Sequence, residues 1–278
     1  MVKTMTSKAL FFGVLLFSAL SAFAEEKEDD NPGLVMDYYK RTCPQAEDII
    51  KEQVNLLYKQ QQNNAFSWLR NVFHNCFVES CDASLLLDST REMLECHDVV
   101  SCTDIIVLSG RDGIVALGGP YIPLKTGRRD GRRSRADILE QHLPSHNESI
   151  SVVLERFANI GINTPGAVAL LVDPQLNPEH IPRILKKCPY SIPDTKAMQY
   201  VRNDRGTPLK LDNNYYRYIL DNKGLMLVDQ QLAVDKRTRL YVKKLAKSQD
   251  YFKEFARAIT VLSENNPLTG TKGEIRKQ

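Results

Sequence analysis

The stretch Trp68–Leu87, WLRNVFHNCFVESCDASLLL, decides how this chain of 278 residues folds and what it can do. Its first half predicts a helix, because its apolar residues recur at spacings that share one helical face. Arg70 and His74 are four positions apart, so they project from neighbouring turns of the same side. A titratable base, a fixed cation and the aromatic ring of Phe73 therefore face one small volume. This set suits chemistry on a small, polar substrate that carries a proton.

The second half of the stretch predicts a tight loop that is rich in oxygen donors. Asn75, Asp82 and Ser84 carry side-chain oxygens. Cys76 and Cys81 can clamp the loop. Oxygen donors in a short irregular loop suit a hard cation such as calcium. An Arg and a His four apart on a helix usually have no chemical role when they stand alone, so the interpretation depends on the longer string.

The string Arg-x-x-Phe-His-x-Cys, followed by Val-x-x-Cys-Asp-Ala-Ser-Leu-Leu-Leu, resembles the distal motif of the class III plant secretory haem peroxidases. The resemblance extends over nearly the whole chain after residue 24. It implies an all-α fold of two lobes with haem b between them, and oxidation of small phenolic donors by hydrogen peroxide. In that reaction His74 would move a proton between the peroxide oxygens, Arg70 would stabilise developing charge, and Phe73 would shape the distal wall.

The resemblance also implies two calcium sites. The expected ligands are Asn75, Val78, Ser80, Asp82 and Ser84 at the distal site, and Asp204, Thr207 and Asp212 at the proximal site. Asn75 stands where the family has Asp, and Ser80 where the family has Gly, a residue used where the backbone needs positive φ. Because calcium affinity depends on ligand charge and rigidity, we expect weakened calcium binding.

The N-terminus predicts a cleavable secretion signal. Lys3 and Lys8 precede the apolar run Ala9–Leu20, and small residues up to Ala24 follow it in the A-x-A manner. Residues 1–24 are thus expected to be a signal peptide and residues 25–278 one peroxidase domain, secreted to the cell exterior or the cell wall.

The composition of the mature chain argues against membranes and nucleic acids as its partners. The apolar run is too short for a transmembrane helix, so we expect no membrane contact after cleavage. Cleavage would lower the formal charge from +3 to +1, because it removes two lysines and no acidic residue. A near-neutral total argues against nucleic acid as a partner. We expect a monomer whose ligands are hydrogen peroxide and phenolic donors.

Six cysteines behind a secretion signal are expected to form disulfides, although their number alone leaves many pairings open. Zinc is a weaker interpretation, because the spacings match no common zinc site. The family partners of Cys102 and Cys188 have no counterparts in this sequence, so both should remain unpaired. The disulfides that the resemblance implies are Cys76–Cys81 and Cys43–Cys96.

The domain is internally shortened at two places relative to the family. Near residues 90–95 it lacks a segment whose Asn orients the distal histidine. Near residues 171–173 it lacks the Gly-Ala-His whose histidine ligates the haem iron, so the fold should be incomplete on the proximal side. Asp229 keeps the position that would accept that histidine's other ring proton. His180 is the nearest remaining histidine, but prolines two residues away on both sides indicate a bend.

Two functions therefore remain open on the sequence. The chain is a secreted peroxidase, or it is a catalytically inactive relative with a structural or binding role. Because no haem proximal ligand is found, we expect little peroxidase activity from this chain.

Three further motifs bear on the fold and on the surface. The Asp104 and Arg128 motifs match the family, which implies a buried ion pair between them. Leu143-Pro144 resembles the family's aromatic-substrate edge, with Pro144 binding the donor, and a plain turn is the alternative. Asn147-Glu-Ser is a glycosylation sequon.

Helices are expected over residues 44–59, from 65, and over 101–117, 150–160, 165–171, 215–222, 238–247 and 249–265.

Overall fold

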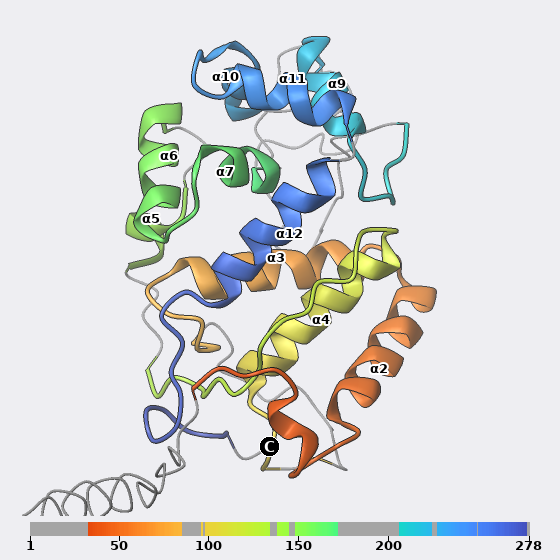
Figure 1. Cartoon of the computed structure of the whole chain (residues 1–278), viewed down its shortest axis with the longest axis vertical. Coiled ribbons are helices and arrows are strands. Elements are labelled where there is room, and N and C mark those ends of the chain that lie inside the picture. Colours follow the sequence, from red (N-terminus) through yellow and green to blue (C-terminus); the bar gives the residue numbers. More distant parts are fainter. Residues whose placement is uncertain are drawn as a thin grey trace, which may run out of the picture. The chain divides into compact units, whose positions relative to one another are not determined.

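Helices make up the regular structure of the described residues (Figure 1). The computed structural model describes residues 33–84, 96, 98–133, 138–144, 148–171, 206–223, 227–248 and 250–276. All of them belong to one unit, residues 33–278. The extended pairings within these ranges are isolated bridges, Val35–Thr126, Arg128–Thr269 and Asp130–Glu274. The predicted all-α class is confirmed.

The helices follow the amphipathic patterns of the sequence. In chain order they are the 3-10 helix η2 (Tyr38–Lys40), α2 (Ala46–Gln60), α3 (Asn64–Phe77), α4 (Cys102–Ala116), α5 (Leu139–His142), α6 (Ile150–Asn159), α7 (Thr164–Leu170), α9 (Asn214–Leu220), α10 (Leu227–Val234), α11 (Arg239–Lys247) and α12 (Asp250–Ser263).

The start of α2 differs from the prediction by two residues. Pro44 was expected at the first helical position, but the helix begins at Ala46 and Pro44 lies in a turn before it. The turn is closed by the Ala46 amide, which donates to the Cys43 carbonyl at 3.0 Å. Glu47 and Asp48 still occupy the first turn, where carboxylates stabilise the positive end of the helix dipole.

Helix α3 packs against α4, and α4 also packs against α2 (Figure 1). Gly110 on α4 allows the close approach of α3. A Cβ atom at this position would lie 2.4 Å from Cγ2 of Val72, closer than side chains can tolerate. The predicted apolar face of α3 is the one that packs here, with Val72 and Cys76 fully buried.

A second group of helices is joined to the first by α12. This helix contacts both α3 and α7, while α6 contacts α7 and α9 contacts α10 and α11. The rings of Phe77 on α3 and Phe157 on α6 lie 4.9 Å apart, so one apolar core runs between the groups. These two groups correspond to the two expected lobes. The predicted opening on the proximal side falls on residues 172–205, which lie outside the described residues.

A buried ion pair connects four distant segments. Arg128 Nη1 lies 2.8 Å from Asp104 Oδ1, and both side chains are fully buried. The same guanidinium donates through Nε and Nη2 to the Ser263 carbonyl at the end of α12, at 3.0 and 2.7 Å. The other carboxylate oxygen of Asp104 accepts from the Tyr39 hydroxyl and the Gly127 amide, each at 2.7 Å.

This pair also explains why Ser101 and Asp104 form only half of a capping box at the start of α4. The Ser101 hydroxyl accepts from the Asp104 amide at 3.1 Å, as expected for an N-cap. The Asp104 carboxylate does not return to Ser101, because Tyr39, Gly127 and Arg128 occupy it. The Ser101 amide donates instead to the Tyr39 hydroxyl at 3.3 Å.

Replacing Asp104 by Asn should lower the free energy of unfolding by about 3–5 kcal/mol, because it leaves the Arg128 charge buried without its partner. Urea unfolding followed by circular dichroism measures this change. The matched control is Lys244→Ala, which breaks an exposed pair with Asp250 and should cost less than about 1 kcal/mol. Equal losses in the two variants would contradict the account of the buried pair.

Candidate active site

Helix α3 brings Arg70 and His74 together, as their spacing predicts. Arg70 Nε donates to His74 Nε2 at 3.2 Å. An accepting Nε2 requires the neutral ring with its proton on Nδ1. Burial lowers the pKa of His74, and the Arg70 charge lowers this pKa further. His74 is therefore kept as a neutral base.

Phe73 lies beside this pair and forms part of a small aromatic cluster. Its ring centroid is 4.8 Å from Phe77 and 6.0 Å from Phe157, and it meets His74 edge-on at 6.2 Å. The wall next to His74 is thus made by α3 and α6 together. The contribution of Phe157 was not predicted, because a lone apolar residue on a distant helix gives no signal in the sequence.

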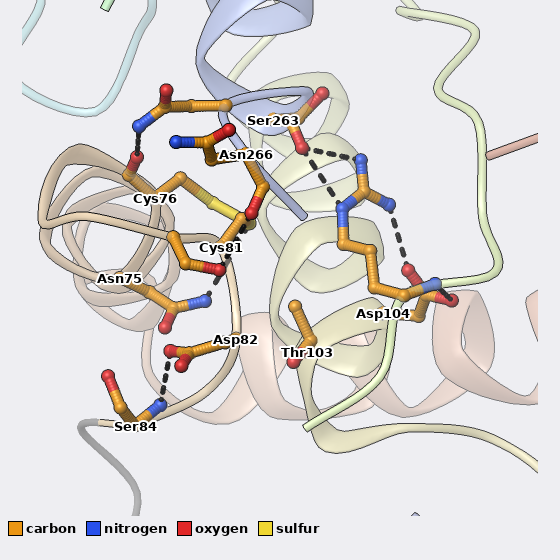
Figure 2. The surroundings of a disulfide bond; sticks show 12 residues. Asn75, Cys76, Cys81, Asp82, Ser84, Thr103, Asp104, Ser263 and Asn266 are labelled. Atoms are coloured by element: carbon orange, nitrogen blue, oxygen red, sulfur yellow. Dashed lines mark hydrogen bonds and ion pairs between the residues drawn. A yellow bond between two sulfur atoms is a disulfide. The ribbon is translucent and has the colours of Figure 1, made fainter. Parts of the chain in front are cut away.

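The distal loop, residues Asn75–Ser84, follows directly after the pair, and Figure 2 shows it around the Cys76–Cys81 disulfide. Asn75 is 1% exposed, and its Nδ2 lies 3.8 Å from the sulfur of Cys81. Its Oδ1 has no hydrogen-bond partner within the described part of the chain. Asp82 Oδ1 accepts from the Ser84 amide at 3.0 Å. In Figure 2 the oxygens of Asn75, Asp82 and Ser84 point toward one another.

The backbone of the distal loop differs from the prediction at one turn. We expected strained backbone at Ser80, but the positive φ of 52° falls one residue earlier, at Glu79. The Ser80 hydroxyl donates to the Asn266 carbonyl at 2.8 Å. The Ser80 amide donates to the Val78 carbonyl. The turn at Glu79 therefore places the Ser80 hydroxyl and the Ser80 amide against carbonyl groups of the protein.

The C-terminal clamp, residues Asn265–Arg276, holds the distal loop from outside. The Asn265 carbonyl accepts from the Cys81 amide at 3.2 Å, and the Asn265 side chain donates to the Cys76 carbonyl at 2.8 Å. Arg276 donates to the Ala83 carbonyl at 3.0 Å and to the Gly131 carbonyl at 2.8 Å. Sequence reasoning missed these residues, since nothing in a local pattern marks contacts between such distant segments.

The structure contains the Cys76–Cys81 and Cys43–Cys96 disulfides. Cys102 is free and half-buried. Burial, followed by the Asp130 carboxylate, raises the pKa of the Cys102 thiol to about 11. Cys188 lies outside the described residues.

The proximal loop is described in part. Asn214 joins two of its expected ligands, because its side chain donates to the Thr207 hydroxyl at 2.8 Å and its amide donates to Asp212 Oδ1 at 2.9 Å. The third expected ligand, Asp204, lies outside the described residues. Asp229 is fully buried and accepts from the Tyr215 hydroxyl at 2.6 Å. Tyr215 was predicted only as part of a helix, and its bond to Asp229 was not foreseen.

The remaining predicted features lie elsewhere on the chain. Pro144 is half-buried and follows α5, and the glycosylation residue Asn147 lies outside the described residues. A hollow of about 380 Å³ lies beside the distal loop, and its lining does not include Arg70 or His74.

Within the described ranges no group of three or more His, Cys, Asp or Glu is placed to hold a metal ion. No described helix has both the length and the apolar character that crossing a membrane requires.

Comparison with known proteins agrees with this geometry. The sequence profile of the peroxidase family matches residues 90–248, more than half of the chain. The chain belongs to the peroxidase family. It is 61% identical to Peroxidase 42 of Arabidopsis thaliana, over 97% of this chain and 96% of the relative. It is 44% identical to Peroxidase 21 of the same plant, over 89% of this chain and 90% of the relative.

The comparison with Peroxidase 42 also bears on the shortened regions of this peroxidase. The alignment spans 316 positions, whereas the chain has 278 residues, so at least 38 positions of the relative have no counterpart here. The chain is therefore shorter than this relative within the aligned region, and the places of the two missing segments stay a prediction.

The haem that the peroxidase family implies fits one side of the site. Arg70, His74 and Phe73 present a base, a cation and an apolar wall on α3, which suits the peroxide-binding side of the group. On the other side, the carboxylate that would brace an iron-ligating histidine accepts a hydrogen bond from Tyr215. His142, the second histidine of the described ranges, has its Nδ1 3.0 Å from the Ile138 carbonyl. No iron ligand is identified among the described residues.

Cys102 should be the slowly reacting thiol of the native peroxidase. With a pKa of about 11 it stays protonated at pH 8, and the thiolate is the form that alkylates. We expect slow modification by iodoacetamide in the native protein and rapid modification in urea, measured by peptide mapping. The four disulfide cysteines should react only after reduction. Alkylation of those four without a reductant would show the pairing to be wrong.

Replacing Arg70 by Gln should raise the pKa of His74 part of the way to its ordinary value. The substitution removes the second cause of the lowered pKa and leaves the first, burial, in place. Proton NMR of the His74 ring as a function of pH measures this, with the resonance assigned by His74→Gln. Arg132→Gln, at an exposed arginine, is the control and should leave the pKa of His74 unchanged. A lower pKa of His74 in the Arg70→Gln protein would refute the effect assigned to the Arg70 charge.

Proposed function

We propose that this chain is a secreted haem peroxidase that uses hydrogen peroxide to oxidise small phenolic donors at the cell exterior or cell wall. The observation that carries the proposal is the contact of Arg70 with His74 on one face of α3. The relatives support it, because Peroxidase 42 and Peroxidase 21 bear the name of this activity. Haem, when bound, supplies the iron centre and the oxidising power of the reaction.

The chain's own residues supply the proton transfer. A neutral His74 takes a proton from peroxide at Nε2 and returns it to the departing oxygen, a role worth about 10²–10⁴-fold in rate. Arg70 must release Nε2 before this happens, and its guanidinium is then free to stabilise the charge on the departing oxygen. Phe73 excludes water from that side. Since burial and Arg70 lower the pKa of His74, the base stays competent in weakly acidic solution.

The chain is secreted, and it binds phenolic donors and calcium. Residues 1–24 act as the signal peptide and residues 25–278 form the peroxidase domain, a monomer glycosylated at Asn147. Phenolic donors meet the edge at Pro144. Thr207 and Asp212, with Asp204, hold a calcium ion in the proximal loop, and the distal loop binds calcium more weakly than a site with two carboxylates.

A second candidate function is a non-catalytic relative with a structural or binding role. Two observations favour it. At least 38 positions of Peroxidase 42 are missing here, and the shortened region near residues 171–173 is where the family has its iron-ligating histidine. In addition, the Asp229 carboxylate that would support such a ligand is hydrogen-bonded to Tyr215.

Restoring the missing proximal segment should separate the two functions. The mature chain and a version with that segment are refolded with haem and calcium, and guaiacol oxidation and the ferric haem spectrum are measured for both. We expect turnover and a histidine-ligated spectrum in the restored protein and little of either in the shorter chain. In the restored protein His74→Leu should lower turnover by about 10²–10⁴-fold.

Two outcomes would contradict these expectations. Comparable turnover by the two proteins would mean that the shorter chain supplies its own iron ligand, and His180→Ala would then test the nearest candidate. No turnover by the restored protein would overturn the peroxidase proposal itself.

A further inference from the structure

Among the described residues, one buried oxygen of the distal loop has no hydrogen-bond partner. Asn75 is 1% exposed, and its Oδ1 accepts no hydrogen bond from the described residues. Its Nδ2 is directed at the sulfur of Cys81, which fixes the orientation of the amide. A buried carbonyl oxygen without a donor is costly, so such an atom marks a place for an electropositive ligand.

Two other side chains turn their oxygens to the same place. In Figure 2 the Asp82 carboxylate and the Ser84 hydroxyl point toward the Asn75 amide oxygen. Asp82 is held there, because its Oδ1 accepts from the Ser84 amide and its carbonyl accepts from the Gly131 amide at 2.6 Å. A side chain at Gly131 would collide with the carboxylate, since a Cβ would lie 2.2 Å from Asp82 Oδ2. The oxygens are therefore placed before any ligand arrives.

The net charge where the Asn75, Asp82 and Ser84 oxygens converge suits a monovalent cation better than a divalent one. Of the three converging side chains, only Asp82 carries a charge. The adjoining hollow is lined by Glu79 as well, but Arg132 and Arg133 line it too, so its formal charges cancel. Stripping water from a divalent ion costs about four times as much as from a monovalent ion of equal size, in the Born description. A single carboxylate offsets too little of that cost, because calcium affinity follows the number of charged ligands.

We propose that the distal loop binds a monovalent alkali cation, Na⁺ or K⁺, through Asn75 Oδ1, Asp82 and Ser84. The calcium expected at this position in the family does not fit the charge of this chain. The proposal rests on the loop alone and not on haem binding or peroxidase activity. The C-terminal clamp supports it, because Asn265 and Arg276 bind the Cys76 and Ala83 carbonyls and so restrain the loop on both sides of Asp82.

The cation preference can be measured by thermal unfolding of the mature chain, residues 25–278, without haem. The protein is dialysed against EDTA and heated in KCl, NaCl or choline chloride at one ionic strength, and then in choline chloride with added CaCl₂. We expect KCl or NaCl to raise the midpoint by about 2–4 °C over choline chloride, whose cation is too large for the loop. In the Asp212→Asn protein, whose proximal calcium loop has lost a carboxylate, micromolar CaCl₂ should give no such rise.

Two variants test the role of Asn75. Asn75→Asp adds the second carboxylate and should transfer the stabilisation from the alkali ions to micromolar calcium. Asn75→Leu removes the oxygen and should abolish the response to K⁺ and Na⁺. Asp212→Asn, in the proximal loop, is the matched control and should leave the response to alkali ions unchanged.

A direct measurement keeps the proposal testable if a variant fails to fold. Broadening of the ²³Na resonance by the unaltered protein, reversed by K⁺ but not by choline, is the expected sign of a bound ion. Equal midpoints in the three salts together with no ²³Na broadening would overturn the proposal. Stabilisation of the Asp212→Asn protein by micromolar calcium would overturn it as well.

Discussion

The ion pair between Asp104 and Arg128 is the interaction on which the rest of the structure depends. Both charges are removed from water, and the pair is favourable because the guanidinium and the carboxylate each make further hydrogen bonds to buried partners. Those partners, Tyr39, Gly127 and Ser263, come from segments far apart in the sequence. The pair therefore fixes the start of α4 relative to the end of α12. Because α3 packs on α4, the position of the helix that carries Arg70 and His74 follows from this one buried contact.

The sequence predicted the parts of the site that are local. The spacing of Arg70 and His74 was enough to place them in contact, since a helix determines which side chains are neighbours. The loop after them was also foreseen, because oxygen-bearing residues and two cysteines lie within ten positions. What could not be predicted were partners brought in from elsewhere, such as Asn265 and Arg276, which carry no local signature. The positive φ at Glu79 was missed as well, because Glu79 is not a residue type that marks a left-handed turn in a sequence.

The distal and proximal sides of the expected haem site differ in which of their residues are present and how those residues are held. On the distal side the base, the cation and the aromatic wall share one helix and a packed cluster with Phe157. On the proximal side Asp229 is buried, and its Oδ1 accepts a hydrogen bond from Tyr215, a neutral donor. This contact keeps a buried charge tolerable where the family would use a histidine. The shortened chain thus retains an ordered core around Asp229.

The C-terminal clamp has a consequence for the order of events during biosynthesis. Asn265 bonds to the Cys76 carbonyl across 189 residues, and Arg276 bonds to the Ala83 carbonyl across 193. A growing chain emerges N-terminal end first, so helix α3 and the Cys76–Cys81 ring leave the ribosome long before their clamp exists. The distal loop can take its final form only after nearly the whole domain has been synthesised. Completion of the distal loop is consequently a post-translational event, and it awaits residues at the far end of the domain.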